Sequence, residues 1–551
     1  MATSGPIKKS GADWWRGAVI YQIYPRSYQA PDGSGSGTIK GITRRLPHIA
    51  SLGVDAIWLS PFFKSPMADM GYDVSDYCDV DPLFGTLADF DEMVAEAHRL
   101  GLKVMIDQVI SHSSDQHPWF KESRTSRDNP KADWYIWADP KPDGTAPNNW
   151  LSIFGGPAWE WDGVRRQYYM HNFLTSQPDL NFHNPDVQDA LLDTVKFWLE
   201  RGVDGFRLDT VNYYFHDKTL RDNPPMQIQV EGAAQDAPDT NPYTYQNHLY
   251  DKTQPENIEF LKRLRALLDQ YDDRATVGEV GDGYRSLETV AAYTAGDDKL
   301  HMCYTFDLLS PDFSAAHIRK CVTAVETQAA NGWICWAFSN HDVPRHVSRF
   351  MAPGDSQDRV AKIALTTLLS LRGSVCLYQG EELGLTEADI AYEDLQDPYG
   401  MRFWPAFKGR DGCRTPMVWD AGQPYGGFST VKPWLPVPEE HRIRAVDAQQ
   451  GMTGSVLSHY RDTLAFRAGH PAMTEGDFHF LQVNQDLLAF TRRQGDQALL
   501  FVFNLTREAQ SFIVPDTVSV KEQLALPGFK PGFDGAMVKL DGFDAFCATI
   551  G

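Results

Sequence analysis

The chain has 551 residues, of which 42% are hydrophobic and 12% aromatic, so it is too long for one compact core and apolar enough for two or three domains. Its 51 basic and 73 acidic residues give a formal net charge of -22, which argues against nucleic acid or an anionic membrane as the partner. The 15 Trp and 22 Tyr residues fit either a ligand that stacks on rings or ordinary core packing.

The N-terminal residues 1–14 are polar and lack the apolar stretch of a signal peptide, and no apolar run is long enough to cross a bilayer. The seven cysteines are scattered and form no C-x-x-C pair, a pattern typical of free thiols in a reducing compartment. The sequence therefore predicts a cytoplasmic protein, either a monomer or a small homo-oligomer.

Strands and helices alternate in the first part of the chain. The helix expected at 87–102 carries Phe90, Met93, Val94 and Ala97 at the spacing of one helix face. Such alternation predicts parallel strands joined by crossover helices. The elements expected here are a strand at 18–25, a helix at 39–52, a strand at 55–61, the helix at 87–102 and a strand at 103–109.

A loop-rich stretch of Pro, Gly, Asn, Asp and Trp interrupts this alternation at 113–181 and predicts an inserted small domain. The alternation then resumes, which gives eight strand–helix units and predicts an α/β fold of the (β/α)8 TIM barrel type. The later elements are expected at 187–201 and 256–271 (helices), 205–211, 275–280, 301–309 and 335–342 (strands), 360–371 (helix) and 374–381 (strand).

The end of the chain has a different pattern. After a helix expected at 456–470, short runs such as 488–491 and 498–504 alternate as strands do, which predicts a C-terminal β-sandwich. The predicted domains are a first part of the barrel at 1–112, the insert at 113–181, a second part of the barrel at 182–470 and the sandwich at 471–551.

One of the expected strands carries an arginine and an aspartate two residues apart, Arg207 and Asp209. Alternate residues of a strand share a face, so the two side chains point the same way. An aspartate beside an arginine is expected to stay ionised at neutral pH, and such a carboxylate at a strand end is a candidate nucleophile. The alternative interpretation is a buried structural ion pair.

Other polar residues also follow apolar strands, at the rim where a barrel holds its active site. Asp107 ends the third strand and precedes His112, Glu279 ends the fifth, and His341 and Asp342 end the seventh. Burying unpaired carboxylates costs several kcal/mol each, which favours a function over solvated rim charges. Paired carboxylates are the chemistry of glycoside hydrolysis, and the residues are not spaced as a metal motif.

These motifs resemble the α-amylase family of glycoside hydrolases, in particular its α-glucosidase and oligo-1,6-glucosidase branch. Four family motifs occur in order, and a fifth, at 177–181, resembles a marker of the branch. The resemblance covers nearly the whole chain from Trp14 onward and implies that no cofactor takes part. The four motifs are 107–112, 205–209, 278–280 and 339–342.

The resemblance implies a role for each matching residue. Asp209 would be the nucleophile of a covalent glucosyl-enzyme, Glu279 the general acid and then base, and Asp342 a stabiliser of the transition state through sugar hydroxyls. Arg207 would hold Asp209 ionised, and His112 and His341 would bind hydroxyls of the non-reducing glucose.

The resemblance also implies a pocket for a single terminal glucose. Tyr72 would stack on the sugar, and Asp69 would pair with Arg410 to close the pocket end. Phe154 and Phe173, from the insert, would be aromatic walls, although core packing is the alternative interpretation for each.

Two departures from the family concern calcium, which binds several hard oxygen ligands. In the loop 30–38, Ala30, Ser34 and Thr38 replace the acidic ligands and only Asp32 remains, so this site is expected to be empty. Ser111 stands where the family usually has asparagine, which puts a second calcium site in doubt. The sequence therefore predicts no bound metal.

The function expected from the resemblance is a retaining, exo-acting α-glucosidase that removes terminal α-1,4-linked glucose from maltose and short oligosaccharides, with transglucosylation as a further activity. Thr210, which follows the nucleophile, goes with α-1,4 linkages in the resembling branch, where valine goes with α-1,6. A sucrose-directed or transglycosylating enzyme, of the amylosucrase, sucrose isomerase or trehalose synthase type, is the alternative. Non-catalytic, transporter-associated family members are disfavoured because this chain keeps all three acids.

Overall fold

Eight parallel strands form a nearly closed barrel in the computed structural model, which describes residues 11, 13–31, 33–227 and 238–551. The strand order is β11-β10-β9-β5-β2-β1-β13-β12, and a parallel bridge between Cys303 and Ile334 joins the two ends of this order. The predicted barrel is confirmed. Its strands are β1 Val19–Ile23, β2 Ala56–Leu59, β5 Lys103–Gln108, β9 Gly205–Leu208, β10 Ala275–Val280, β11 Met302–Thr305, β12 Cys335–Trp336 and β13 Ser374–Tyr378.

Helices cover the outside of the barrel, which is why its strands are apolar on both faces and buried throughout. Local sequence sets their ends: Thr86 and Asp89 form a capping box that starts α2, and Asn184 caps α4 ahead of a proline. The main helices are α1 Ile39–Leu52, α2 Leu87–Arg99, α4 Pro185–Glu200, α5 Asn257–Leu268, α6 Ser286–Thr294, α7 Ala315–Gln328 and α9 Gln357–Ser370. Shorter ones are α8 His346–Phe350, α10 Pro398–Phe403, α11 Glu439–Arg442 and α12 Val446–Gln449.

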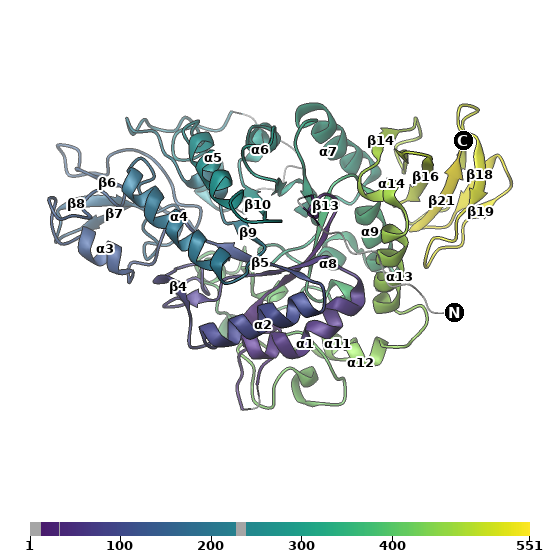
Figure 1. Cartoon of the computed structure of the whole chain (residues 1–551), viewed down its shortest axis with the longest axis horizontal. Coiled ribbons are helices and arrows are strands. Elements are labelled where there is room, and N and C mark those ends of the chain that lie inside the picture. Colours follow the sequence, from purple (N-terminus) through teal and green to yellow (C-terminus); the bar gives the residue numbers. More distant parts are fainter. Residues whose placement is uncertain (1–10, 12, 32, 228–237) are drawn as a thin grey trace.

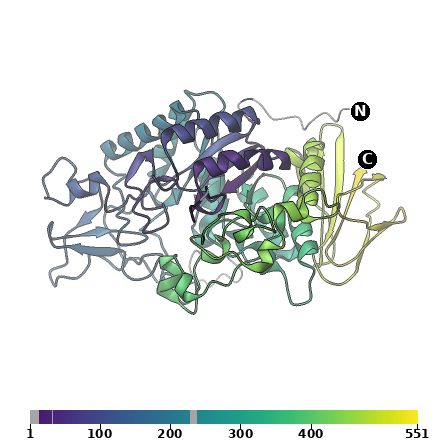
Figure 2. The same cartoon turned by 90° about the horizontal axis from the view of Figure 1, so that it is seen from below.

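The stretch between β5 and α4 folds as a small layer at one end of the molecule (Figures 1 and 2). It holds α3 Pro118–Ser123 and an antiparallel sheet of β6 Trp137–Ala138, β8 Gln167–Met170 and β7 Trp159–Asp162 around its own apolar cluster. A second insertion into the barrel, which the sequence did not predict, is the antiparallel hairpin of β3 Phe63–Lys64 and β4 Asp76–Val80. The exact domain boundaries given above stay a prediction.

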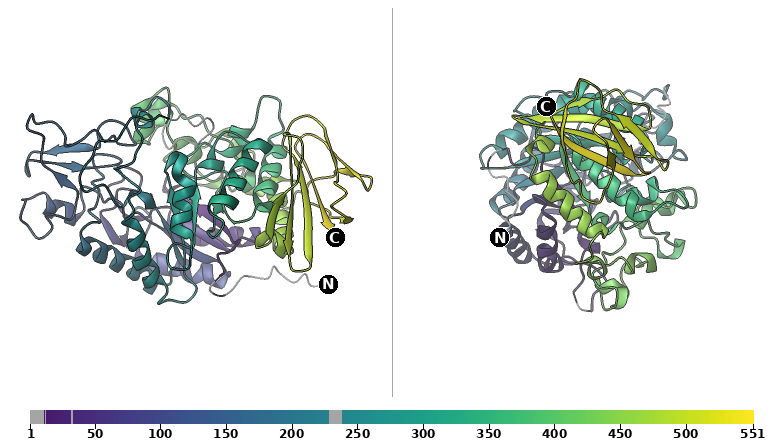
Figure 3. Two further views of the ribbon diagram at one scale, coloured as in Figure 1. Left: turned by 90° about the horizontal axis from the view of Figure 1, so that it is seen from above. Right: turned by 90° about the vertical axis from the view of Figure 1, so that its right-hand side faces the viewer.

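The C-terminal part is the predicted β-sandwich, at the opposite end of the molecule (Figure 3). Two antiparallel sheets enclose an apolar core, and α13 Val456–Ala468 and α14 Pro471–Thr474 connect them to the barrel. One sheet has the order β14-β15-β16-β21-β18 and the other β17-β20-β19. The strands are β14 Asp477–Phe480, β15 Leu487–Gln494, β16 Gln497–Asn504, β17 Gln510–Ile513, β18 Val520–Gln523, β19 Gly532–Phe533, β20 Met537–Leu540 and β21 Asp544–Ile550.

Arginine side chains join the sandwich to the barrel through main-chain carbonyls. Arg492 of β15 is fully buried and donates to the carbonyl of Ser370 at the end of α9, at 2.8 Å. In the other direction, Arg319 of α7 donates to the carbonyls of Leu481 and Leu487, at 3.1 Å each. A cation at the C-terminal end of a helix satisfies its last carbonyls, as Arg492 does for α9. The contacts of both arginines are structural.

None of the helices in the described part of the chain is long and apolar enough to cross a membrane. All seven cysteines are free thiols, and six of them are buried.

Candidate active site

Three neighbouring strands end with the charged residues that the sequence analysis singled out. The register of β5 and β9 places Asp107 opposite Arg207, and the register of β10 and β11 places Glu279 opposite Tyr304. All four side chains are buried. Since matched positions of neighbouring parallel strands share a face, these groups meet at the carboxyl end of the barrel.

Arg207 is the centre of this group and has no solvent exposure. Its Nη1 atom donates to Asp107 Oδ1 at 2.7 Å and to Asp209 Oδ1 at 2.6 Å, and its Nη2 atom lies 2.7 Å from Glu279 Oε1. Its Nε and Nη2 atoms also donate to the Tyr304 hydroxyl. One guanidinium therefore faces three carboxyl groups, and a cluster with this balance of charge retains protons.

Burial is the largest influence on the protonation of these acids. It raises the pKa of Asp107 to about 6 and those of Asp209 and Glu279 to about 7, against the opposing charge of Arg207. The predicted rise in the pKa of Glu279 is confirmed, although burial contributes more than the neighbouring acids do. Arg207 acts to lower the pKa of Asp209, as expected, but burial acts more strongly and the net shift is upward. Asp209 thus shares the protons of the carboxyl cluster, and its ionisation as a nucleophile stays a prediction.

Thr210 connects the two acids. Its backbone N–H donates to Glu279 Oε2 at 3.0 Å, and its hydroxyl donates to Asp209 Oδ2 at 3.2 Å and lies 2.9 Å from the Ser111 hydroxyl. Its φ of 41° and ψ of 49° are left-handed, an uncommon conformation for a β-branched residue that costs of order 1–3 kcal/mol. Surrounding contacts must hold this strain, which marks the residue as functional.

Asp342 lies beyond the end of β12, and its side chain is 22% exposed. Its Oδ1 accepts from Arg414 Nη2 at 3.0 Å and from Arg410 Nη1 at 3.3 Å, and its Oδ2 lies 3.2 Å from His341 Nε2. Burial acts to raise the pKa of Asp342, but the permanently charged guanidiniums of Arg410 and Arg414 act against it, and the net shift is downward. Asp342 is therefore ionised, while burial lowers the pKa of His341 and keeps that ring neutral.

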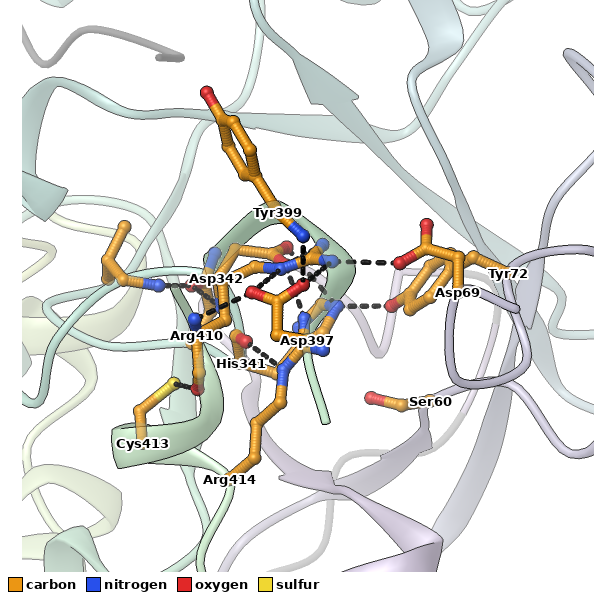
Figure 4. A network of polar contacts seen from close by, with 12 residues as sticks. Ser60, Asp69, Tyr72, His341, Asp342, Asp397, Tyr399, Arg410, Cys413 and Arg414 are labelled. Carbon is orange, nitrogen blue, oxygen red and sulfur yellow. Dashed lines mark hydrogen bonds and ion pairs between the residues drawn. The ribbon is translucent and has the colours of Figure 1, made fainter. Parts of the chain in front are cut away.

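An ion pair of two cavity-lining residues, Asp69 and Arg410, borders one end of the site, and Figure 4 shows its contacts. Arg410 Nη2 donates to Asp69 Oδ1 at 2.8 Å and to Asp397 Oδ1 at 2.8 Å, and Gln177 Nε2 donates to the other oxygen of Asp69 at 3.1 Å. Burial raises the pKa of Asp69 to about 6 despite Arg410, whereas Arg410 outweighs the burial of Asp397 and lowers its pKa to about 2.

Aromatic and histidine side chains line this closed end. The Tyr72 ring stacks on His341, with centroids 5.3 Å apart, and its hydroxyl donates to Asp107 Oδ2 at 3.2 Å. His112 lies 5.1 Å from Phe173, and burial lowers its pKa to about 4, so it is neutral. Phe154 and Phe173 meet edge to face at 5.6 Å, and Phe154 also stacks on Tyr399 at 4.7 Å.

These residues surround a cavity of about 710 Å³. Every residue predicted for the site lines it except Arg207 and His341, which lie fully buried behind the residues they contact. Phe154 and Phe173 thus combine the two interpretations given above, since each packs against other rings and also borders the cavity. The predicted lining residues are Asp69, Tyr72, His112, Phe154, Phe173, Asp209, Thr210, Glu279, Asp342 and Arg410.

Four further residues belong to the site and had no role assigned from the sequence. Gln177 stands in the motif 177–181 and Arg414 lies four residues after Arg410, so their positions were the available signal. Tyr304 donates to Glu279 Oε1 at 2.9 Å, and the strand register could have identified it. Asp397 lies in a loop before a short helix, and nothing in the local sequence marks it as a partner of Arg410.

The described residues of the loop 30–38 do not offer the acidic ligands that calcium prefers. Ala30 has no side-chain oxygen, the Ser34 hydroxyl donates to the Ser36 carbonyl, and the Thr38 hydroxyl caps α1. Asp32 lies outside the described residues. The residues present do not fit the ion, and no group of three His, Cys, Asp or Glu side chains within the described ranges is arranged to hold a metal.

A barrel with two buried carboxyls beside a closed, aromatic-lined pocket defines a glycoside hydrolase. Comparison with known proteins agrees. The family model described as alpha amylase, catalytic domain, matches residues 22–476. The chain therefore belongs to the alpha-amylase family and is a glycoside hydrolase.

Individual relatives indicate which branch of the family the chain resembles. A probable alpha-glucosidase of Rhizobium meliloti (strain 1021) is 58% identical over 549 residues, which cover 100% of this chain and 99% of that protein. An oligo-1,6-glucosidase of Parageobacillus thermoglucosidasius is 36% identical over 540 residues, covering 92% and 93%. The crystal structure of the alpha-glucosyl transfer enzyme XgtA has a TM-score of 0.95 and 53% identity, covering 98% of this chain and 100% of that one.

Proposed function

We propose that the protein is a retaining, exo-acting α-glucosidase that hydrolyses terminal α-1,4-linked glucose in maltose and short oligosaccharides. The observation that carries the proposal is the pair Asp209 and Glu279, both held by the one guanidinium of Arg207 and both bonded to Thr210. Two carboxyls tied to the same two residues lie close together, as the ~5–5.5 Å separation of retaining pairs requires.

In this mechanism Asp209 attacks the anomeric carbon while Glu279 gives its proton to the leaving oxygen, and the base form of Glu279 then activates water. The raised pKa of Glu279, to about 7, supports its role as the acid. Asp342, ionised between Arg410 and Arg414, is suited to bind sugar hydroxyls and to balance the positive charge that develops on the ring.

Exo action follows from the closed end of the cavity. Asp69, its partner Arg410 and Tyr72 all line the cavity. We expect one glucose ring to fit between them and the acids, with no further sugar beyond it. Substrates are therefore expected to present their non-reducing end. This makes short oligosaccharides the substrate class, with no nucleic acid or membrane as partner.

Transfer of glucose to a sugar acceptor is the second candidate function. The likeness to an alpha-glucosyl transfer enzyme over the full chain favours it, and a cavity of about 710 Å³ leaves room for an acceptor beyond the first glucose. The two functions share the glucosyl-enzyme and differ only in whether water or a hydroxyl of a second sugar accepts the glucose.

Product analysis tests both. The purified enzyme is incubated with maltose, isomaltose, sucrose and trehalose, and the anomer released first is followed by proton NMR. We expect the α-anomer of glucose to appear first, with maltose consumed fastest. First release of the β-anomer would contradict retention, and products longer than the substrate would measure transfer.

A further inference from the structure

Lys252 is a buried lysine that has no part in the chemistry described above. It lies in the long segment between β9 and α5 and is 3% exposed. Burying an ammonium group costs several kcal/mol unless hydrogen bonds compensate for the lost water, so its position requires a reason.

Three oxygens accept hydrogen bonds from the ammonium group of Lys252. Its Nζ atom donates to the Tyr213 hydroxyl at 2.9 Å, to the Tyr243 hydroxyl at 3.0 Å and to the Gly281 carbonyl at 2.8 Å. These hydrogen bonds compensate for water that the ammonium group loses on burial. We call Lys252 with these three partners the lysine clamp.

The lysine clamp joins the segments that follow the two acids. Tyr213 is in the 3-10 helix Val211–Tyr213, directly after Asp209 and Thr210, and Gly281 comes directly after the end of β10, which carries Glu279. Asn212 reinforces the connection, since its Nδ2 atom donates to the Gly281 carbonyl at 3.0 Å. Both Tyr213 and Gly281 line the cavity.

The position of the clamp relative to Glu279 identifies the part of the substrate that it faces. The first glucose occupies the end closed by Asp69 and Arg410. A general acid must reach the oxygen of the leaving group, so residues that adjoin Glu279 away from that closed end border the leaving group or the incoming acceptor. We place Tyr213 and Gly281 on this side because both line the cavity and the segments that carry them follow the two acids directly.

We propose that Lys252 is a positioning residue for the second sugar: it fixes the Tyr213 side chain and the Gly281 carbonyl where the leaving glucose departs and an acceptor sugar enters. The proposal rests on the proposed glucosidase function and goes beyond it, because it assigns specificity for the second sugar to a residue that touches neither the substrate nor the acids. Loss of the clamp should affect reactions that use the second sugar and spare those that do not.

Two substrates separate these reactions. α-Glucosyl fluoride places only a fluoride ion beyond the first glucose, whereas a disaccharide places a second sugar there. In Lys252→Met, we expect kcat/KM to fall about tenfold for the disaccharide that the wild type cleaves fastest, the effect of one lost pocket contact, and to stay within about twofold for the fluoride. Lys262→Met, on the surface of α5, is the matched control and should change neither value.

A second variant distinguishes loss of the lysine clamp from misfolding of the Lys252 variant. Tyr213→Phe keeps the ring and removes only the hydroxyl that Lys252 binds, and it should show the same bias toward the fluoride. A parallel loss on both substrates would reduce Lys252 to a structural residue, and unchanged kinetics in both variants would likewise overturn the proposal. A wild type that cleaves the fluoride but inverts configuration would overturn the proposed mechanism while leaving this comparison valid.

Discussion

The backbone N–H of Thr210 donates to the carboxyl of Glu279 across two neighbouring strands of the barrel. Thr210 lies just beyond the end of β9 and adopts a left-handed conformation. The same residue donates its hydroxyl to Asp209. The position after the nucleophile thus fixes the geometry of both acids, and substitutions there should alter specificity through the acids as well as through direct contact.

Thr210→Val tests the linkage preference. The wild type is expected to cleave maltose much faster than isomaltose, and the valine variant should shift the ratio of the two kcat/KM values toward isomaltose by about 10–200-fold. Valine keeps the branched side chain but loses the hydroxyl bonds to Asp209 and Ser111. Ser111→Ala is the control, because it removes one of these bonds and leaves Thr210 in place. An unchanged ratio in the valine variant would contradict the assignment.

Glu279→Gln tests the general acid. The amide cannot give up a proton, so kcat on maltose should fall by about 10²–10⁴-fold. The loss should be smaller on α-glucosyl fluoride, whose leaving group needs little protonation. These rates are measured by glucose release and by a fluoride electrode. Full activity of the variant on maltose would show that another group is the acid.

The raised pKa of Glu279 also predicts a pH dependence of stability. Its pKa is about 7 in the folded enzyme and about 4.3 in an unfolded chain, so between these values the folded state binds more protons. The contribution of the Glu279 proton to the free energy of unfolding is complete below about pH 4 and is lost as pH rises through about 7. Glu279→Gln should therefore lose less apparent Tm than the wild type between about pH 4 and about pH 7. Glu288→Gln, at an exposed position of α6, should behave as the wild type does.

Arg410→Ala tests the closed end of the pocket. Its guanidinium contacts Asp69, Asp342 and Asp397, and removing one partner of buried ion pairs costs about 3–5 kcal/mol. We expect a lower apparent Tm and a higher KM for maltose. Arg442→Ala breaks an exposed pair with Glu439 and one hydrogen bond to the Ala421 carbonyl, and it should change the Tm little. Equal effects of the two variants would show that the Arg410 network does not stabilise the site.

Activity should be insensitive to chelators. Ser34 and Thr38 of the loop 30–38 use their hydroxyls in hydrogen bonds within the fold, and calcium prefers several carboxylate oxygens. Dialysis against EDTA should leave both kcat and the thermal midpoint unchanged, and metal analysis of the purified enzyme should find less than about one calcium per chain. A calcium-dependent midpoint would refute the prediction.

Much of the barrel could be predicted because its strands are continuous apolar runs and its helices carry clear apolar faces. The rim residues Asp107, Arg207 and Glu279 were equally visible, since a charge that follows such a run stands out. The left-handed Thr210 was not, because β-branched residues rarely adopt that conformation and no sequence pattern indicates it. Asp397 could not be predicted for a different reason. Its contact with Arg410 depends on loop conformation, and loops have no periodic sequence pattern.

The arginines that join the sandwich to the barrel have a consequence for any attempt to shorten the enzyme. Removal of residues 477–551 would take away Arg492 and leave the last turn of α9 with an unpaired carbonyl at Ser370. It would also remove the carbonyl partners of Arg319. The Arg319 side chain would then lie without these partners on a newly exposed apolar surface of the barrel. We therefore expect the catalytic barrel and its sandwich to be stable only together, as one cooperative unit. Recombination with a relative should exchange the two together.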